Sequence, residues 1–150
     1  MKRRLHIASA ILAMALIASF WTATVATELF AGHETIALVK TLVLYGMVLL
    51  VPAMAAAGAT GASLGRGWRL PQVARKSTRM KWIAANGLLI LVPSAVFLAL
   101  RAGAGQFDTA FYTVQGLELV AGATNLTLLI LNMRDGRALG RRRSRKSASR

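Results

Sequence analysis

The last long apolar stretch of the sequence contains residues that could do chemistry or hold helices together. Gln115, Glu118, Gly122, Asn125 and Asn132 follow one another at spacings of three, four, three and seven residues. On a helix with 3.6 residues per turn these spacings lie along one stripe. A carboxyl group among amides can bind a proton or a cation, or accept hydrogen bonds. The stripe is therefore the first candidate for a functional site.

The surroundings of Glu118 decide which chemistry we expect from it. Glu118 is the only charged residue from Thr109 to Met133, and a helix places it about 13–14 Å from the start of that stretch. An ionised, unpaired carboxylate in apolar surroundings costs several kcal/mol, so Glu118 should be paired or protonated. The candidate partners elsewhere in the sequence are Lys40, Asn86, Gln115 and Asn125.

Four long apolar stretches must position these residues. They are about 5–28, 36–58, 82–101 and 109–133. About 20 apolar residues in a helix cross a lipid core, and a backbone within lipid must be helical. The sequence predicts an all-α membrane protein in which residues 1–133 form an up-down bundle of four transmembrane helices. A signal peptide cleaved after Ala26 is the alternative for the first stretch, although its apolar run is longer than usual signal cores.

The positive charge is segregated along the chain. The net charge is +14, and only Lys40 and Arg101 of the 19 lysines and arginines fall outside three segments. Those segments precede the first stretch, separate the second from the third, and follow the fourth. The positive-inside rule then puts both termini in the cytoplasm. We expect a multi-pass protein of a bacterial cytoplasmic (inner) membrane. The charge needs no nucleic-acid partner.

Basic residues on the cytoplasmic side are expected to contact anionic lipid headgroups, each contributing about 1 kcal/mol near the surface. The residues are Arg66, Arg69, Arg75, Lys76, Arg79, Lys81, Arg141, Arg142 and Arg143. Residues 134–150 form a basic tail with serines and no apolar periodicity, which is typical of a disordered segment.

Two apolar stretches resemble each other. Gly46 to Ala53 reads G-M-V-L-L-V-P-A, and Gly87 to Ser94 reads G-L-L-I-L-V-P-S. Inverted repeats and proline-interrupted helices occur in transporters, but residues common in membranes also match by chance. Each proline removes a backbone hydrogen bond and is expected to bend its helix.

Several classes of function lack their usual residues. The sequence contains no cysteine, which excludes disulfides and thiolate metal sites. It contains no G-x-S-x-G, H-E-x-x-H or phosphate-binding glycine motif. We therefore expect no enzyme, no catalytic residue, no metal site and no cofactor.

The run Q-G-L-E-L-V-A-G-A-T-N-L-T-L-L-I-L-N-M-R-D-G, from Gln115 to Gly136, resembles small four-helix bacterial inner-membrane proteins that carry no assigned function. The resemblance extends over most of the chain. It implies the same location and fold, and it implies no ligand or activity.

Three functions remain open. The first is an accessory or assembly protein that packs against itself or other membrane subunits through the stripe around Glu118. The second is a small proton- or cation-coupled transporter in which Glu118 titrates. The third is a haem-binding electron carrier that uses His6 or His33. These histidines lie about one bilayer thickness apart in the predicted topology, so one haem within a single chain could not use both.

Overall fold

Within the part of the chain that the structure describes, nearly all residues are helical. The computed structural model describes residues 1–65 and 71–148, with the side chains of 1–65 and 74–137. The elements are α1 (Lys2–Phe30), α2 (His33–Gly65), α3 (Pro71–Asn86), the π-helical turn η1 (Gly87–Leu91), α4 (Val92–Gly103) and α5 (Thr109–Ala148).

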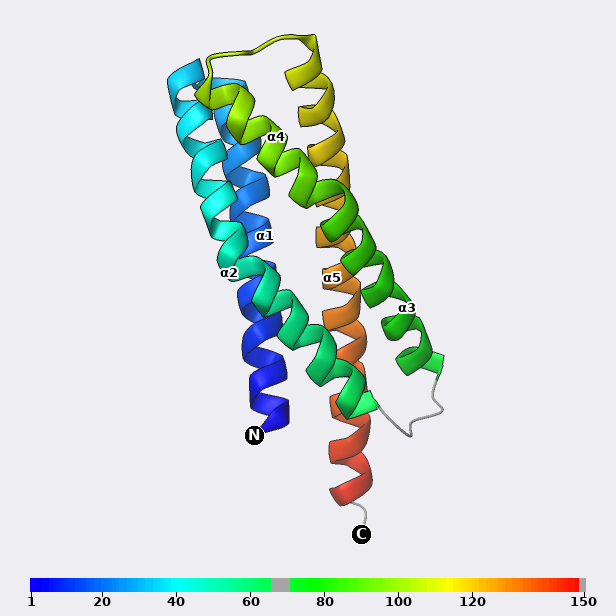
Figure 1. Cartoon of the computed structure of the whole chain (residues 1–150). Helices are drawn as coiled ribbons and strands as arrows, with labels where there is room; N and C mark the ends of the chain where they lie inside the picture. Colours follow the sequence, from blue (N-terminus) through cyan, green and yellow to red (C-terminus); the bar gives the residue numbers. More distant parts are fainter. Residues whose placement is uncertain (66–70, 149–150) are drawn as a thin grey trace.

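Four helical segments are long and apolar enough to cross a membrane. They are Lys2–Phe30, His33–Gly65, Ala74–Gly103 and Thr109–Arg137. The third consists of most of α3 followed by η1 and α4, which continue one another as a single rod in Figure 1. The prediction of an all-α chain with four membrane-compatible helices is therefore confirmed.

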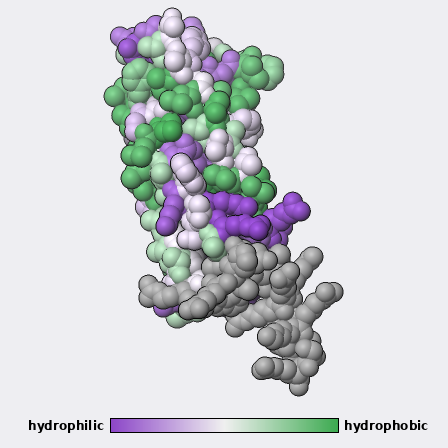
Figure 2. Space-filling model, turned by 90° about the vertical axis from the view of Figure 1, so that its right-hand side faces the viewer, coloured by the Kyte–Doolittle hydropathy of each residue, from purple (hydrophilic) through white to green (hydrophobic). Residues whose placement is uncertain are grey.

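The four long segments lie side by side along one axis (Figure 1). The N-terminus and the C-terminal part of α5 lie at one end, which we call the terminal end. The connections 31–32 and 104–108 lie at the other end, which we call the loop end. Helix α1 packs against α2 and α5, and α4 packs against both α2 and α5. Hydrophobic residues cover the middle of the face in Figure 2, and hydrophilic residues gather toward its ends.

Three helix boundaries differ from those expected. Helix α2 continues to Gly65 and α3 begins at Pro71, so much of the loop expected over 59–81 is helical. Proline suits the first turn of a helix because its missing N–H needs no partner there. Helix α5 continues through Ala148 instead of ending at Met133, and the arginines and alanines beyond Met133 favour helix. The expected disorder of residues 134–150 thus contrasts with a helical backbone up to Ala148.

The two similar proline-containing stretches have different backbones. Pro52 lies inside α2, which is assigned as α-helix throughout. Pro93 instead follows η1, in which the N–H of Val92 bonds to the carbonyl of Gly87. Proline cannot complete the usual bond to the residue four positions earlier, and a wider π turn is one way to accommodate that loss. The resemblance between the stretches therefore does not extend to their backbone structure.

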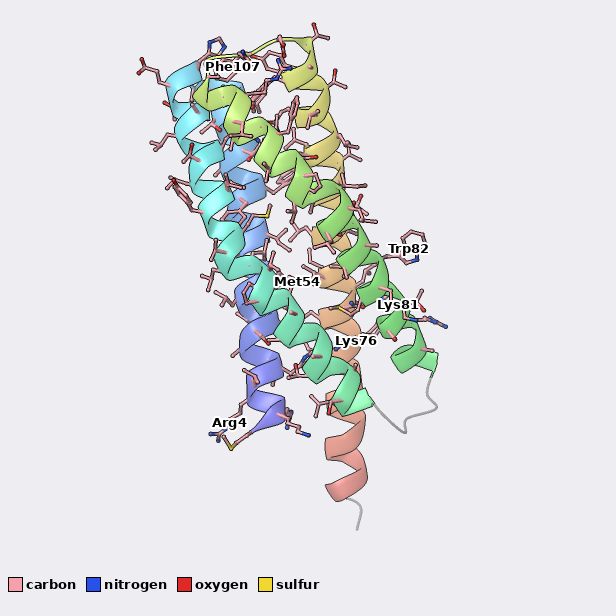
Figure 3. All side chains as sticks on the ribbon, viewed as in Figure 1. Arg4, Met54, Lys76, Lys81, Trp82 and Phe107 are labelled. Atoms are coloured by element: carbon pink, nitrogen blue, oxygen red, sulfur yellow. The ribbon has the colours of Figure 1, made fainter. Side chains whose placement is uncertain are left out.

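Apolar side chains form two buried clusters. The cluster nearer the terminal end contains Ala13, Ile17, Leu50, Ala53, Ile83 and Leu129. The cluster nearer the loop end contains Ile36, Leu98, Ala102 and Phe111. A stack of His33 on Phe107 lies beside the second cluster, and Figure 3 shows Phe107 at the loop end. The polar residues of the predicted stripe occupy the space between and beside these clusters.

Close helix contacts depend on glycine at two positions. A Cβ atom added to Gly46 in α2 would lie 2.3 Å from the Phe20 ring of α1. A Cβ atom on Gly122 in α5 would lie 3.0 Å from the indole of Trp21. The Phe20 ring therefore occupies space that a larger residue at position 46 would fill, and the Trp21 ring would have to shift slightly for a larger residue at position 122.

Candidate functional site

The buried face of α5 contains most of the polar stripe predicted from the sequence. Gln115, Glu118, Asn125 and Asn132 are each exposed by less than a tenth of their surface. They alternate with buried apolar residues, because Phe111 precedes Gln115 by one turn and Leu129 follows Asn125 by one turn. The stripe thus faces the chain's own helices.

An ion pair between α2 and α5 forms the centre of the site. The Lys40 Nζ atom lies 2.6 Å from Glu118 Oε2 and donates a hydrogen bond to it. Only 1% of Lys40 and 9% of Glu118 is exposed. The Gln115 Nε2 atom donates to the same carboxylate oxygen over 3.3 Å. The sequence suggested Lys40 and Gln115 as partners of Glu118, and the structure brings the three together.

The carboxylate of Glu118 is paired through one oxygen. Among the described side chains, no donor contacts its Oε1 atom. Glu118 also lines a cavity of about 50 Å³, whose walls come mainly from apolar residues of α1, α2 and α5. Thr24 and Trp21 line the same cavity from α1. A volume of this size holds a few water molecules, because one water needs roughly 10–15 Å³.

Glu28, in the last turn of α1, extends the site toward the loop end. It lies within electrostatic range of Lys40, Glu118 and His33. Its Oε1 atom is buried and has no hydrogen-bond partner. In the sequence, Glu28 ends the first apolar stretch, and with His33 and Glu34 it forms a small group of residue types that can bind metals but whose spacing matches no strong motif. Glu28 follows the buried Thr24 by one helical turn and so shares its helix face, but the burial of Thr24 is visible only in the structure.

A second polar layer links the third segment to α5. The Asn86 Nδ2 atom donates to Asn125 Oδ1 and to the carbonyl of Ala121, each over 2.8 Å. The Asn125 Nδ2 atom donates in turn to the carbonyl of Ile83 over 3.3 Å. Asn86 and Asn125 therefore bond to each other, and neither contacts Glu118. This layer fixes the position of the third segment relative to α5.

Trp21 fixes α1 against α5 beside the cavity. Its Nε1 atom donates to the carbonyl of Leu119 over 3.0 Å. In the sequence, Trp21 lies near the outer end of the first apolar stretch, which predicts a position at the membrane interface and nothing more. Its hydrogen bond to a backbone carbonyl could not be read from the sequence, because every residue has such an acceptor.

The basic residues expected at lipid headgroups have several environments. Arg75 and Lys81 are exposed, and in Figure 3 Lys81 lies on the opposite side of the molecule from Arg4 and farther from the terminal end. Arg79 instead forms an ion pair with Asp135 of α5 over 2.6 Å, and Lys76 is partly buried. Arg66 and Arg69 lie outside the described residues, as do the side chains of Arg141, Arg142 and Arg143.

The histidines occupy separate sites. His6 Nδ1 lies 3.0 Å from the carbonyl of Ala57 and 3.2 Å from Thr60 Oγ1. His33 stacks on Phe107 at the opposite end, with ring centroids 4.1 Å apart. Within the residues that the structure describes, no three His, Cys, Asp or Glu side chains are grouped to hold a metal ion.

Comparison with known proteins adds no relative. No family model matches the chain, and neither a curated protein nor a solved structure matches it.

Proposed function

We propose that the chain is a multi-pass protein of a bacterial cytoplasmic membrane, folded as an up-down-up-down bundle with both termini in the cytoplasm. The segregation of lysine and arginine in the sequence supports this orientation. The N-terminus and the end of α5 lie together in Figure 1, as the proposal requires. The packing of α1 against α2 and α5 supports retention of the first helix.

Within that membrane, the proposed function is a small proton- or cation-coupled carrier with Glu118 as its titrating group. The observation that carries this proposal is the half-paired carboxylate. Its Oε2 atom bonds to Lys40, while its Oε1 atom has no donor among the described side chains. Glu118 also lines the cavity. A cation or proton arriving there would find an acceptor oxygen to which no described side chain donates.

The energetics of buried ion pairs support the same proposal. Burying two charges costs several kcal/mol per ion, and well-packed apolar residues often stabilise a protein as well or better. The Lys40–Glu118 pair is therefore a poor device for stability alone. Ionisable residues within a membrane usually mark ion pathways or ligand sites.

Transport by proteoliposomes tests this proposal. The full-length protein would be reconstituted with an internal pH-sensitive dye, and a pH gradient would be imposed with and without a gradient of sodium or potassium. We expect proton movement above that of empty vesicles, and its loss in Glu118→Gln. Glu34→Gln is the matched control, because Glu34 is an exposed acid at the loop end. Equal rates in empty and protein-containing vesicles would contradict the proposal.

If Glu118→Gln folds poorly, a double variant that removes both charges of the pair can replace it in the transport test. Lys40→Met combined with Glu118→Met leaves no unpaired charge in the membrane and retains apolar volume. This double variant is expected to fold and to be inactive. Transport at the wild-type rate by the double variant would exclude the ion pair from the function.

An accessory or assembly role is the second candidate. The observation that favours it is the hydrogen bonding between Asn86 and Asn125, which joins the third segment to α5. Because the polar stripe faces inward, a partner subunit would have to contact the apolar outer surface instead. The mass of the protein in lipid nanodiscs distinguishes the candidates. A complex with one other subunit in a fixed ratio favours the accessory role.

A further inference from the structure

The cavity between α1, α2, η1 and α5 offers few polar groups to a ligand. Of the eleven described residues that line it, only Trp21, Thr24 and Glu118 carry a side-chain oxygen or nitrogen. The N–H of Trp21 is already used, because it donates to the carbonyl of Leu119 over 3.0 Å. The remaining groups are the hydroxyl of Thr24 and the Oε1 atom of Glu118, to which no described side chain donates.

The rest of the lining is aromatic or aliphatic. The rings of Phe20 and Trp21 line the cavity from α1, and Val43 and Met47 line it from α2. Such walls favour carbon groups, because burying apolar surface away from water stabilises a complex. A cavity with apolar walls and one polar anchor suits a ligand that has an apolar body and one hydrogen-bond donor.

Cations fit these walls poorly. Hard metal cations bind to about six or more oxygen ligands, whereas only Thr24 and Glu118 among the lining side chains supply oxygen. An organic ammonium ion would share the Glu118 carboxylate with Lys40, whose Nζ atom lies 2.6 Å away. One positive charge would then be left in apolar surroundings, which is unfavourable. An uncharged ligand keeps the pair balanced. Among the coupling ions of the proposed function, the proton is favoured because it needs a single acceptor and no shell of ligands.

The volume of the cavity limits the size of the ligand. One water molecule needs roughly 10–15 Å³, so a cavity of about 50 Å³ accommodates about three to five atoms of similar size. A short-chain alcohol such as 1-propanol, with three carbons and one hydroxyl group, lies within this range.

We propose that the cavity binds small uncharged alcohols, with the hydroxyl group donating to Glu118 Oε1 and the carbon chain lying against Phe20, Val43 and Met47. No covalent bond forms or breaks, and the charge of the Lys40–Glu118 pair does not change. Transport of the alcohol by this chain rests on the proposed function, but its binding does not.

The arrangement of the helices gives such a ligand a route from the lipid. Helix α2 packs against α3 and α4, but its backbone does not closely approach η1, which packs against α5 instead. Leu91 of η1 lines the cavity, and its neighbours Leu88 and Leu89 are exposed on the outer surface. In the proposed membrane an uncharged alcohol can enter the lipid core, whereas an ion enters it only at a high cost.

Quenching of Trp21 fluorescence tests the proposal in the full-length protein in liposomes. The sequence has three tryptophans, and Trp68→Phe with Trp82→Phe leaves Trp21, which lines the cavity. The probe is 2-bromoethanol, because its bromine quenches an indole that it contacts. We expect quenching that saturates above the linear collisional component. For 1-bromopropane, which has a methyl group in place of the hydroxyl, the affinity should be lower by about tenfold or more, because the hydrogen bond to a charged group is lost.

A variant of the cavity wall has a matched control on the same helix. Val43→Leu adds a methylene group beside the cavity and is expected to weaken the saturable quenching. Val48→Leu makes the same change at a residue that is 77% exposed on the outside of α2, and it should behave as the wild type. Competition keeps the test independent of folding in these variants. Added 1-propanol should restore Trp21 fluorescence, and the propylammonium ion, which has the same size and a charge, should not.

Three results would overturn the proposal. The first is quenching by 2-bromoethanol without a saturable component, and the second is an equal affinity for 1-bromopropane. The third is displacement of 2-bromoethanol by propylammonium at lower concentrations than by 1-propanol, which would indicate a cation site. Saturable quenching in a protein that moves no protons would contradict the carrier alone. Proton movement without saturable quenching would contradict the alcohol site alone.

Discussion

Two ion pairs tie other helices to α5 at the same distance but in different surroundings. The Lys40–Glu118 and Arg79–Asp135 pairs both have a nitrogen–oxygen separation of 2.6 Å. The side chains of the first are 1% and 11% exposed, and those of the second are 24% and 30% exposed. Water and salt screen the second pair and not the first. Because the two distances are equal, the difference in burial predicts that the first pair costs more to break than the second.

The largest difference between the two pairs should appear when each loses its acid. Glu118→Gln leaves a buried ammonium group without a counter-ion, and we expect a loss of about 3–5 kcal/mol in the free energy of unfolding. Asp135→Asn should cost only about 0–1 kcal/mol, because Arg79 is partly solvated. Reversible unfolding in mixed micelles, followed by tryptophan fluorescence, measures both. Equal losses of unfolding free energy in the two variants would show that burial does not make the Lys40–Glu118 pair costlier to break than the Arg79–Asp135 pair.

A steric change in the interior should have the next largest effect. Gly46→Ala forces the Phe20 ring to move, and overpacking of this kind costs about 1–3 kcal/mol. Gly116→Ala is the matched control, because a Cβ atom there meets nothing within 4 Å. The control should leave the protein unchanged or slightly more stable, since alanine favours helix over glycine. A stable Gly46→Ala protein would mean that α1 and α2 are not packed as described.

Removing a neutral polar group from the interior should cost less than removing a charge. Asn86→Ala breaks two hydrogen bonds and leaves Asn125 Oδ1 without its donor. Hydrogen bonds between membrane helices contribute about 0.6 kcal/mol on average and up to about 1.7 kcal/mol, which sets the expected loss. The exposed Thr124, which bonds only within its own helix, provides the control Thr124→Ala. Thermal unfolding of both variants provides the measurement, and a larger loss in the control would contradict this ranking.

Salt should distinguish the two pairs with a smaller effect. Arg79→Ala is expected to lower the free energy of unfolding by less than about 1 kcal/mol. This loss should be smaller at high ionic strength, where salt already screens the pair. The contribution of Lys40, measured with Lys40→Met, should change little over the same range. Unfolding at low and high sodium chloride checks both. A Lys40 contribution that falls with salt would indicate that water reaches the interior pair.

The smallest effect is expected at the start of α5. The backbone N–H of Phe111 donates to Asp108, which lowers the pKa of that carboxyl, and Arg101 adds to the decrease. A lowered folded-state pKa means that the stabilisation is complete above the ordinary aspartate pKa and is lost as the pH falls through the lowered value. The protection factor of the Phe111 amide against hydrogen exchange, which corrects for the intrinsic pH dependence of exchange, should therefore fall on acidification. In Asp108→Ala the acid-dependent step should disappear, and its persistence would contradict this assignment.

Much of the fold followed from patterns that the sequence displays directly. Four apolar stretches predict four helices because lipid excludes any other backbone arrangement for them. The helix ends were less predictable. The sequence predicted a loop over 59–81, which Pro71 interrupts. In the structure, α2 continues to Gly65 and Pro71 begins α3. The sequence also did not predict that the backbone differs at Pro52 and Pro93. The residues before the two prolines are nearly identical, yet Pro52 lies in an α-helix and Pro93 follows a π turn.

The candidate site was predictable where partners share a helix and uncertain where they do not. The spacing of Gln115 and Glu118 predicts their contact, because residues three apart share a helix face. Lys40 was one of several possible partners, since its depth was known but its rotation about α2 was not. Glu28 and the cavity could not be predicted. Both depend on how α1 rotates against α2 and α5, and that rotation follows from aromatic–glycine contacts absent from any single helix.

A double-mutant cycle on Lys40 and Glu118 tests the central claim most directly. The free energy of unfolding would be measured for the wild type, Lys40→Met, Glu118→Met and the double variant, in the same lipid. The buried pair predicts that the double variant is more stable than either single variant, by at least about 2 kcal/mol, because only the single variants leave a charge unpaired. Losses that add, within about 0.5 kcal/mol, would show that the two side chains do not interact inside the protein.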